Sequence, residues 1–360
     1  MVLNTFQKLC CFTLGLLLIT CGSPPPVSHE TASGEENTQP LIYEVVFIIH
    51  GDGAYLFHDL DGNEHRADEE ALAGAKKVAE QNDQAEVFIF HEKHKKHRFF
   101  LFPRHDGEFY YYRNGKLLAQ ESYWRDHGKS RFDPEVDLFN RFHLEVQHER
   151  KRIFLYLGHE IPEIDGKGYD ASYRSRSFTV NDLAYGLERL TCDSSVFDLV
   201  VLSTCFNGTP YTVSALSPNA RYIVASPGNL HLSYLDLRPF EALDIGLHDG
   251  DVYALAKDCA RKSFDRLTAN IQTEITVSVY DVDRVQEFLC SVDSVYNLAL
   301  TTALKQEAVT SMGHCDCAED PAYVRPAMSD GIDVLFRPAR FGRSAHKQNH
   351  SGWECPKLPK

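Results

Sequence analysis

The sequence predicts an α/β protein with a mostly parallel sheet that is covered by helices on both faces and carries a small β-hairpin insertion. Apolar, β-branched runs alternate along the chain with amphipathic segments that have the period of a helix. Several of these runs are apolar on both faces, which is typical of strands buried in a parallel sheet. The pair Asn114-Gly115, set among alternating aromatic and polar residues, predicts the turn of a hairpin.

The expected elements follow one another through most of the chain. Strands are predicted at Tyr43–His50, Glu86–His91, Arg152–Leu157, Phe197–Leu202, Arg221–Ala225 and Glu274–Tyr280, with the hairpin inside Phe99–Tyr123. Helices are predicted at Ala67–Asn82, Asp133–Glu149, Thr179–Leu190, Asp251–Leu267 and Asp283–Lys305. The first of these helices begins with an acidic turn and the second with Asp-Pro, and both are signals of a helix N-terminus.

Composition and charge limit the class of partner. The chain has 360 residues, of which 43% are hydrophobic and 24% charged, and its formal net charge is −14. Nucleic-acid binding requires clustered Lys and Arg, so this balance argues against nucleic acid as a partner. The one dense basic stretch, residues 91–100, is too short to change that conclusion.

The N-terminus is expected to be a targeting segment followed by a tether. Residues 1–21 contain an apolar stretch too short to span a bilayer with margin, and they end in a pattern that resembles a bacterial lipobox with Cys21 as the acylated residue. Thr20 departs from the usual small residue, which leaves an ordinary secretory signal or a short anchor as the alternative. Residues 22–40 are too polar to bury and are expected to be flexible. Gly22 favours an outer-membrane or periplasmic, lipid-anchored position in a bacterial cell envelope.

Cysteine usage points to one unpaired thiol. After the targeting segment the chain has seven cysteines: Cys192, Cys205, Cys259, Cys290, Cys315, Cys317 and Cys355. An odd number in an exported protein leaves at least one thiol free. If that thiol is Cys205, six remain for disulfides whose pairing the sequence leaves open. Residues 41–310 are expected to form the α/β domain, and residues 311–360 an irregular tail containing Cys and Pro.

Two consecutive predicted strands end on reactive side chains. "FLYLGH" ends on His159, and "LVVLSTC" ends on Cys205. Ligands of parallel α/β sheets bind at the carboxyl ends of the strands, so neighbouring strands would bring both side chains to one edge. The pair suits nucleophilic catalysis, in which the imidazole takes the thiol proton and later protonates the leaving amine. Each residue also has an ordinary structural interpretation, as a small core cysteine and a hydrogen-bonded histidine.

These segments resemble the clostripain-type cysteine peptidases of the caspase-like clan. The resemblance rests on "FLYLGHE", "FTVNDLAYGLERL", "FDLVVLSTC" and "YIVASPGNL", with "YEVVFIIHGDG" before them, and covers roughly residues 41–300 in order. It implies a caspase-like three-layer sandwich, an endopeptidase acting on peptide or protein substrates, Cys205 as nucleophile and His159 as general base and acid. It implies neither a cofactor nor a metal in the catalytic step.

Two departures from the family pattern concern the oxyanion environment. The family usually has Gly directly after the catalytic His, whereas here Gly158 precedes it and Glu160 follows it. Thr204 replaces the Ala that usually precedes the nucleophile. Gly158, Glu160 and Thr204 are therefore the candidate neighbours of the oxyanion.

A third departure concerns the substrate pocket. The acid that the family places two residues before the nucleophile, associated with a basic P1 side chain, is Ser203 here. Specificity for Arg or Lys is therefore not carried over. Ser203, Ser226 and Asp236 are the candidate pocket residues, and Asp236 is the nearby acid that could restore a preference for a basic P1 residue.

Weaker patterns leave alternatives open. His50, followed by Gly51, is a rival base on the first strand, and Asp52 beside it is equally a turn residue. Asp59, Asp61, Asn63 and Glu70 have the spacing of a calcium loop, but Glu64 stands where that loop needs Gly, so a hairpin turn before a helix is the preferred interpretation and calcium a weak alternative. The segment from His314 to Cys317 with Cys355 lacks a proper zinc spacing and is interpreted as disulfide-forming.

Two functional classes follow from the sequence. The first is a cysteine endopeptidase anchored to the cell envelope through Cys21. The second is a catalytically degenerate caspase-like lipoprotein that binds peptides or glycans at its surface. A separation of the Cys205 sulfur and the His159 imidazole near hydrogen-bond reach favours the first class, and a blocked or disulfide-bonded Cys205 favours the second.

Overall fold

The computed structural model describes residues 40–357 except for short gaps. The gaps are residues 54–55, 59–61, 63, 95–96, 99–101, 126–131, 145–148, 192–194, 231–234, 244–248 and 306–312. The predicted targeting segment with Cys21, nearly all of the tether, Cys192 and most of the calcium-like loop therefore lie outside the described residues. Among the described residues, no helix has the length and apolarity needed to cross a membrane.

A nine-stranded sheet forms the centre of the protein. Its spatial order is β14-β12-β11-β10-β9-β1-β4-β7-β8. The five central strands are parallel: β11 (Ala220–Ala225), β10 (Phe197–Ser203), β9 (Lys151–Leu157), β1 (Tyr43–His50) and β4 (Ala85–Glu92). Antiparallel pairs flank them on both sides: β12 (Ile275–Asp281) with β14 (Ile332–Arg337), and β7 (Gly107–Arg113) with β8 (Lys116–Tyr123). The predicted mostly parallel sheet with a hairpin is confirmed.

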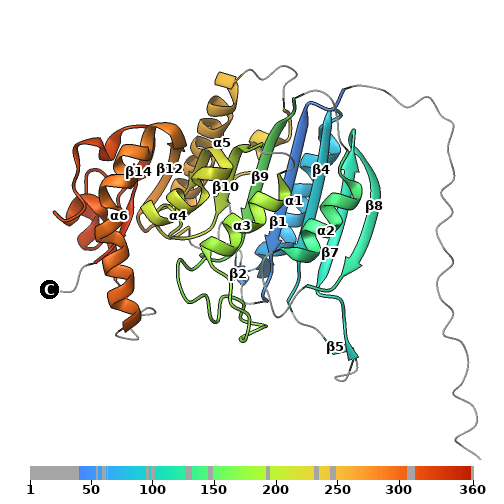
Figure 1. The fold of residues 1–360 in the computed structure, drawn as a ribbon, viewed down its shortest axis with the longest axis horizontal. Coiled ribbons are helices and arrows are strands. Elements are labelled where there is room, and N and C mark those ends of the chain that lie inside the picture. Colours follow the sequence, from blue (N-terminus) through green and yellow to red (C-terminus); the bar gives the residue numbers. More distant parts are fainter. Residues whose placement is uncertain are drawn as a thin grey trace, which may run out of the picture. The chain divides into compact units, whose positions relative to one another are not determined.

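Helices cover both faces of the sheet, which makes three layers (Figure 1). One face carries α2 (Asp133–Phe142), α3 (Val180–Leu190), α4 (Pro210–Leu216) and α6 (Val282–Lys305). The other carries α1 (Ala67–Gln81) and α5 (Asp249–Asn270). Successive side chains of a strand point to opposite faces, so Val46 and Ile48 of β1 enter the first core while Phe47 enters the second.

Small elements complete the chain between and after these layers. The short strands are β2 (Leu56–His58), β3 (Glu64–Arg66), β5 (His97–Arg98), β6 (Phe102–Pro103), β13 (His314–Asp316) and β15 (Glu354–Pro356). Single turns of 3-10 helix occupy residues 217–219, 238–240, 317–319, 326–329 and 343–346. β2 and β3 pair antiparallel just before α1 begins.

Local sequence signals explain where several elements begin and turn. Asn114 and Gly115 have φ angles of 51° and 73°, the left-handed conformation that a two-residue hairpin turn requires at both central positions. At α3, the side chain of Thr179 accepts from the backbone N–H of Asp182, whose carboxylate accepts from the Thr179 N–H. This reciprocal capping box satisfies two amide donors and sets the first turn of α3.

The structure differs from the sequence expectation in two places. α2 ends at Phe142 rather than Glu149. Residues 311–360, expected as an irregular tail, provide β14 to the main sheet and the β13–β15 ribbon. The short strand at 332–337 is flanked by Gly and Pro and lies at the sheet edge, where one side of the strand has no partner among the described residues and the periodic signal is weak.

A disulfide fastens the C-terminal ribbon to the core. Cys317 is bonded to Cys355, and Trp353 beside it is fully buried against Tyr280 and Phe288. The interpretation of this cysteine pattern as disulfide-forming is therefore confirmed for one pair. The other described cysteines, Cys205, Cys259, Cys290 and Cys315, are thiols.

A cluster of buried charges joins the centre of the sheet to the loop after β9. This ion cluster consists of His50, Glu92, Arg125, Asp170 and Arg176. The Arg125 guanidinium lies 2.6 Å from Glu92 and 3.1 Å from Asp170, and these three side chains are almost fully excluded from solvent. Burial alone would lower the pKa of Arg125, but the two carboxylates hold it above its ordinary value. The pair with Arg125 anchors the loop through Asp170. Within the loop, Asp170 also accepts from the backbone N–H of Ser172.

We expect Arg125→Met to lower the free energy of unfolding by about 3–5 kcal/mol, because two buried carboxylates would lose their main counter-charge. Arg141 is the matched control, since its pair with Glu121 is exposed to solvent. Arg141→Met should change the same quantity by less than about 1 kcal/mol. Urea titration of each variant measures both effects, and equal losses in the two variants would contradict the importance of the cluster.

Candidate active site

The parallel pairing of β9 with β10 brings His159 and Cys205 to the same edge of the sheet. Leu157 pairs with Ser203, an offset of 46 residues. The same offset continues past the strand ends, where the Asn207 side chain bonds both the N–H and the C=O of Ile161 at 2.9 Å. His159 and Cys205 share this offset and lie between the two contacts. Neighbouring strands are about 4.8 Å apart, so the two residues follow adjacent strand ends at the same edge of the sheet.

The nucleophile candidate lies at a sharp turn after β10. Phe206 adopts a φ of 53°, which is rare for a residue with a side chain and marks a strained turn. The Cys205 thiol lies 3.3 Å from Oδ1 of Asn229, and the Leu230 N–H donates to the sulfur at 3.3 Å. The sulfur is not in a disulfide bond and is partly exposed. This state is the one that nucleophilic chemistry requires.

Side chains behind the turn hold its shape. Thr204 is fully buried, and its hydroxyl donates to Asn207 at 2.7 Å. The Gly208 N–H donates to Ser226 O, and the Glu354 N–H of the C-terminal ribbon donates to Gly208 O at 3.0 Å. The turn is thus tied to β9, β11 and β15 together.

His159 contacts an acid from the neighbouring strand β1. Its Nε2 lies 3.2 Å from Oδ2 of Asp52, whose side chain is 3% exposed, while the imidazole is 32% exposed. Asp52 Oδ2 also accepts from the N–H of Ala171 at 3.2 Å. Asp52, interpreted from the sequence as equally a turn residue, therefore stands beside the candidate base.

The rival base His50 is buried in the ion cluster. Its Nδ1 lies 2.7 Å from Glu92, its ring stacks on Tyr169, and the residue is 0% exposed. A substrate at the sheet edge cannot reach it in this position. The geometry favours His159.

The predicted neighbours of the oxyanion have different surroundings. The Gly158 N–H donates to Ser203 O at 3.3 Å as part of the sheet, and a Cβ at Gly158 would come within 3.0 Å of His50. Thr204 faces the interior rather than the edge. Glu160 is exposed at the rim of a cavity. Of these three residues, only Glu160 presents its side chain where a substrate could meet it.

The predicted pocket residues lie on the face covered by α1 and α5. The Ser203 hydroxyl accepts from the Leu235 N–H at 2.7 Å. Ser226 is fully buried, and its hydroxyl donates to Thr276 O at 2.7 Å, so it supports the turn after β11. Asp236 is held by the guanidinium of Arg238 through both carboxylate oxygens. Burial works to raise the pKa of Asp236, but the pairing with Arg238 holds it below its ordinary value.

A cavity of about 840 Å³ opens beside His159 on the opposite face. Its walls come from the loop after β9, the nucleophile turn, α6 and the C-terminal ribbon, including Glu163, Phe206, Leu300 and Glu354. Burial raises the pKa of Glu163 to about 7, although hydroxyl donors from Thr209 and Tyr296 act to lower it. Burial likewise raises the pKa of Glu354 to about 8.

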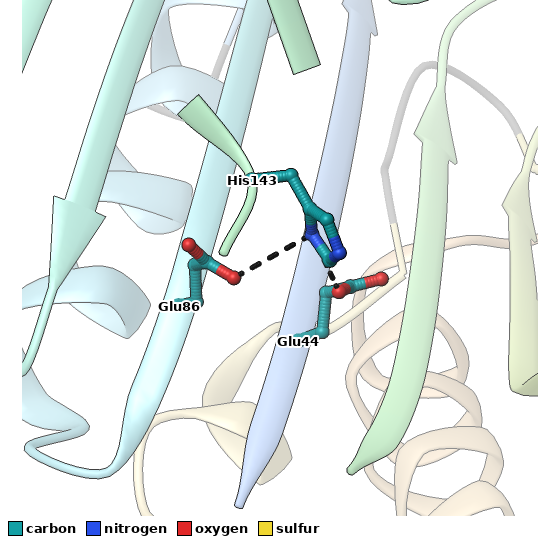
Figure 2. A group of neighbouring side chains, drawn as sticks. All are labelled: Glu44, Glu86 and His143. Atoms are coloured by element: carbon teal, nitrogen blue, oxygen red, sulfur yellow. Dashed lines mark ion pairs between the residues drawn. The ribbon is translucent and has the colours of Figure 1, made fainter. Parts of the chain in front are cut away.

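A second polar cluster resembles a metal site but is already neutralised. Figure 2 shows His143 between Glu44 and Glu86, with Nδ1 at 3.1 and 3.7 Å from their carboxylates. Arg150 binds both glutamates, at 3.3 and 2.5 Å, and Arg152 approaches Glu44. Both glutamates are the second residues of their strands, so the cluster lies at the sheet edge opposite Cys205. Two guanidiniums balance two carboxylates, and a divalent cation would have to displace them.

Sequence reasoning missed four contributors to the site. Asn207 bridges the two strand ends, Asn229 and the Leu230 N–H contact the sulfur, and Asp52 contacts the imidazole. Only Asp52 has a signal in the sequence, namely its place directly after a strand in "HGDG". The others depend on loops whose path the sequence does not indicate.

The chain is similar to known proteins in part of its sequence and in its fold. The model of the clostripain family matches residues 156–323. An inactive zymogen C11 protease from Parabacteroides distasonis has a similar structure, with a TM-score of 0.57, 13% identity, and coverage of 89% of this chain and 92% of that chain. The structure of a secreted C11 cysteine protease from Bacteroides thetaiotaomicron, in complex with an irreversible peptide inhibitor, is also similar. Its TM-score is 0.50 and its sequence identity 12%, with coverage of 71% of this chain and 70% of that chain.

No curated protein matches the chain. At these sequence identities, the similarity to the solved structures shows the fold alone. This fold is the caspase-like fold of C11 proteases, so the predicted three-layer sandwich is confirmed. The family match covers both strand ends that carry the candidate dyad. Residues 156–323, which include His159 and Cys205, match the model of the clostripain family, and the described structure has the fold of C11 proteases.

Proposed function

We propose that this protein is a cysteine endopeptidase in which Cys205 is the nucleophile and His159 the general base and acid. The observation that supports the proposal is the shared offset of 46 residues, which holds from the paired strands through Asn207, together with a Cys205 sulfur that is not in a disulfide. A thiol and an imidazole at one strand edge supply nucleophile and proton carrier together.

The chemistry proceeds in two halves. His159 takes the proton of the Cys205 thiol, and the thiolate attacks the carbonyl carbon of the peptide bond. The imidazolium then gives its proton to the leaving amine as the C–N bond breaks, which leaves an acyl-enzyme. Water, deprotonated by the same imidazole, hydrolyses the thioester and restores the thiol. The Leu230 N–H directed at the sulfur supports the thiolate in both halves.

The cavity beside His159 suits the leaving-group side of the substrate. The general acid must touch the leaving amine, and His159 lines this cavity together with Phe206. Ser203 and Cys205 face the opposite side of the sheet, toward the core beneath α1 and α5. The acyl side of the substrate would therefore lie toward Ser203 and Leu235.

An uncharged P1 residue fits the acyl side best. The resemblance associates a basic P1 residue with an acid at the position of Ser203, and that acid is absent. Asp236, the acid that could replace it, is buried and paired with Arg238. A Lys or Arg side chain would therefore find no free carboxylate at either position.

A lipid-anchored position in the cell envelope completes the proposal. It rests on the targeting pattern ending in Cys21 and on the polar tether after it. The secreted C11 protease from Bacteroides thetaiotaomicron offers a relative that is exported.

We expect Cys205→Ala to abolish peptide hydrolysis and His159→Ala to lower kcat/KM by about 10³-fold or more, because the first removes the nucleophile and the second the proton carrier. A thiol-directed peptide probe should label the unmodified chain but not Cys205→Ala. Cys290→Ala removes another exposed thiol and is the matched control, with activity and labelling unchanged. Hydrolysis that persists in Cys205→Ala would overturn the assignment. Peptide binding without turnover in the unmodified chain would favour the degenerate binding protein.

We expect a peptide library to show no strong preference for Arg or Lys at P1, because Ser203 is uncharged and Asp236 is paired. Ser203→Asp restores the missing carboxylate and should raise the ratio of kcat/KM for basic over neutral P1 residues by about tenfold or more. Asp236→Asn should leave that ratio unchanged. A sharp preference for Arg or Lys that survives Asp236→Asn would contradict this account of the pocket.

We expect the mature protein to be acylated at Cys21 and to partition into detergent. Cys21→Ser should release the protein or stall its processing, because the acylated thiol is lost. Mass spectrometry of the mature N-terminus measures this, with Cys11→Ser as the matched control inside the targeting segment. An unmodified N-terminus downstream of Cys21 would refute the anchor.

A further inference from the structure

We propose that Asp52 is the positioning acid of the catalytic pair, so that the site is a triad of Cys205, His159 and Asp52 rather than a dyad. This inference deepens the proposed function and rests on it. The acid would orient the imidazole and stabilise the imidazolium that forms when the thiol loses its proton. It would not itself take the proton.

The order of the strands carries the first part of the argument. β10, β9 and β1 are consecutive in the sheet and parallel, and Ile49 of β1 pairs with Leu157 of β9. Cys205, His159 and Asp52 follow the ends of these three strands in the same spatial order. His159 thus follows the middle strand, between the strand that leads to the thiol and the strand that leads to the carboxylate.

The contact between Asp52 and His159 is the second observation. Oδ2 of Asp52 lies 3.2 Å from Nε2 of His159, and the carboxylate is nearly excluded from water. A charge pair in such a place is screened less than one on the surface. Because Nε2 faces the acid, Nδ1 is the ring nitrogen that can take the proton of Cys205.

The backbone on both sides of Asp52 requires glycine. Gly53 has a φ of +82°, and a Cβ at Gly51 would come within 2.5 Å of a carboxylate oxygen of Asp68. The Gly51 N–H donates to Glu92 O, and the Ala171 N–H donates to Asp52 Oδ2. The sequence "GDG" therefore places one carboxylate on a turn that other residue types could not adopt without strain.

Other charged groups surround His159 and must be separated from Asp52 in a test. The titratable side chains that line the cavity beside the imidazole are Glu160, Glu163, Asp165, Lys167, His314 and Glu354. On the buried side, burial and the charges of Glu92, Asp170 and Asp52 raise the pKa of Tyr156 well above its ordinary value, although Arg125 acts to lower it. Asp258 of α5 offers a control outside this cavity, because its carboxylate pairs with Lys262 at 2.8 Å on the surface.

The test compares Asp52→Asn with Asp258→Asn in the full chain. Asparagine keeps an acceptor for the Ala171 N–H but removes the charge beside the imidazole. We expect Asp52→Asn to lower kcat/KM by about 10- to 100-fold, mainly through kcat, with the melting temperature nearly unchanged. The imidazolium would lose its proton at lower pH, so the basic limb of the pH profile of kcat/KM should move to lower pH. Asp258→Asn should change neither the rate nor the profile.

A second readout is independent of any peptide substrate. The rate at which iodoacetamide alkylates Cys205, followed against pH by mass spectrometry, reports the thiolate–imidazolium pair directly. In Asp52→Asn the acid limb of this rate should move to higher pH, because the weakened imidazolium supports the thiolate less.

The outcomes separate this inference from the proposed function. An unchanged pH profile in Asp52→Asn, or equal losses in Asp52→Asn and Asp258→Asn, overturns the role of Asp52 while leaving the peptidase intact. Absence of peptide hydrolysis in the unmodified chain overturns the proposed function, and the alkylation profile then decides the role of Asp52. If the alkylation profile of His159→Ala equals that of the unmodified chain, both the proposed function and the role of Asp52 are overturned.

Discussion

The in-register pairing of β9 with β10 is the constraint on which the rest of the site depends. Parallel strands present their carboxyl ends at one edge, and an offset of 46 residues places His159 beside Cys205 there. A slip of one residue in either strand would turn every side chain to the other face of the sheet. Both strands pack against side chains on both faces, so such a slip would require both cores to repack. Asn207 extends the register beyond the last strand pair by bonding both polar groups of Ile161.

The loops at this edge are held by polar groups that have little contact with water. Asp170 ties the loop after β9 to Arg125, and Asp52 ties the same loop to the end of β1 through the Ala171 N–H. The C-terminal ribbon, fastened by the Cys317–Cys355 disulfide, reaches the nucleophile turn at Gly208. The edge that needs one partly exposed thiol and imidazole is thus supported from three directions, which limits the reorganisation required when substrate binds.

Several buried carboxylates away from the candidate dyad are paired with arginine side chains. Arg150 and Arg152 pair with Glu44 and Glu86 at the edge opposite the thiol, and Arg238 pairs with Asp236. The carboxylate of Asp52 instead faces the imidazole of His159. In the proposed triad this carboxylate would act when the imidazolium forms, whereas the pairs with arginine contribute to the folded state.

The sequence by itself determined the layered sheet, most of its strands and helices, and the two strand ends that carry His159 and Cys205, because burial, periodicity and turn residues are properties of short segments. The tertiary structure alone decided which polar side chains meet. His50 and His159 both follow apolar strands, yet one is buried among charges and the other stands at the edge. Asp236 follows the β11 turn but faces Arg238, and β14 joins the sheet from a segment with little periodicity. Contacts between residues far apart in sequence depend on loop paths and neighbouring strands, which no local pattern encodes.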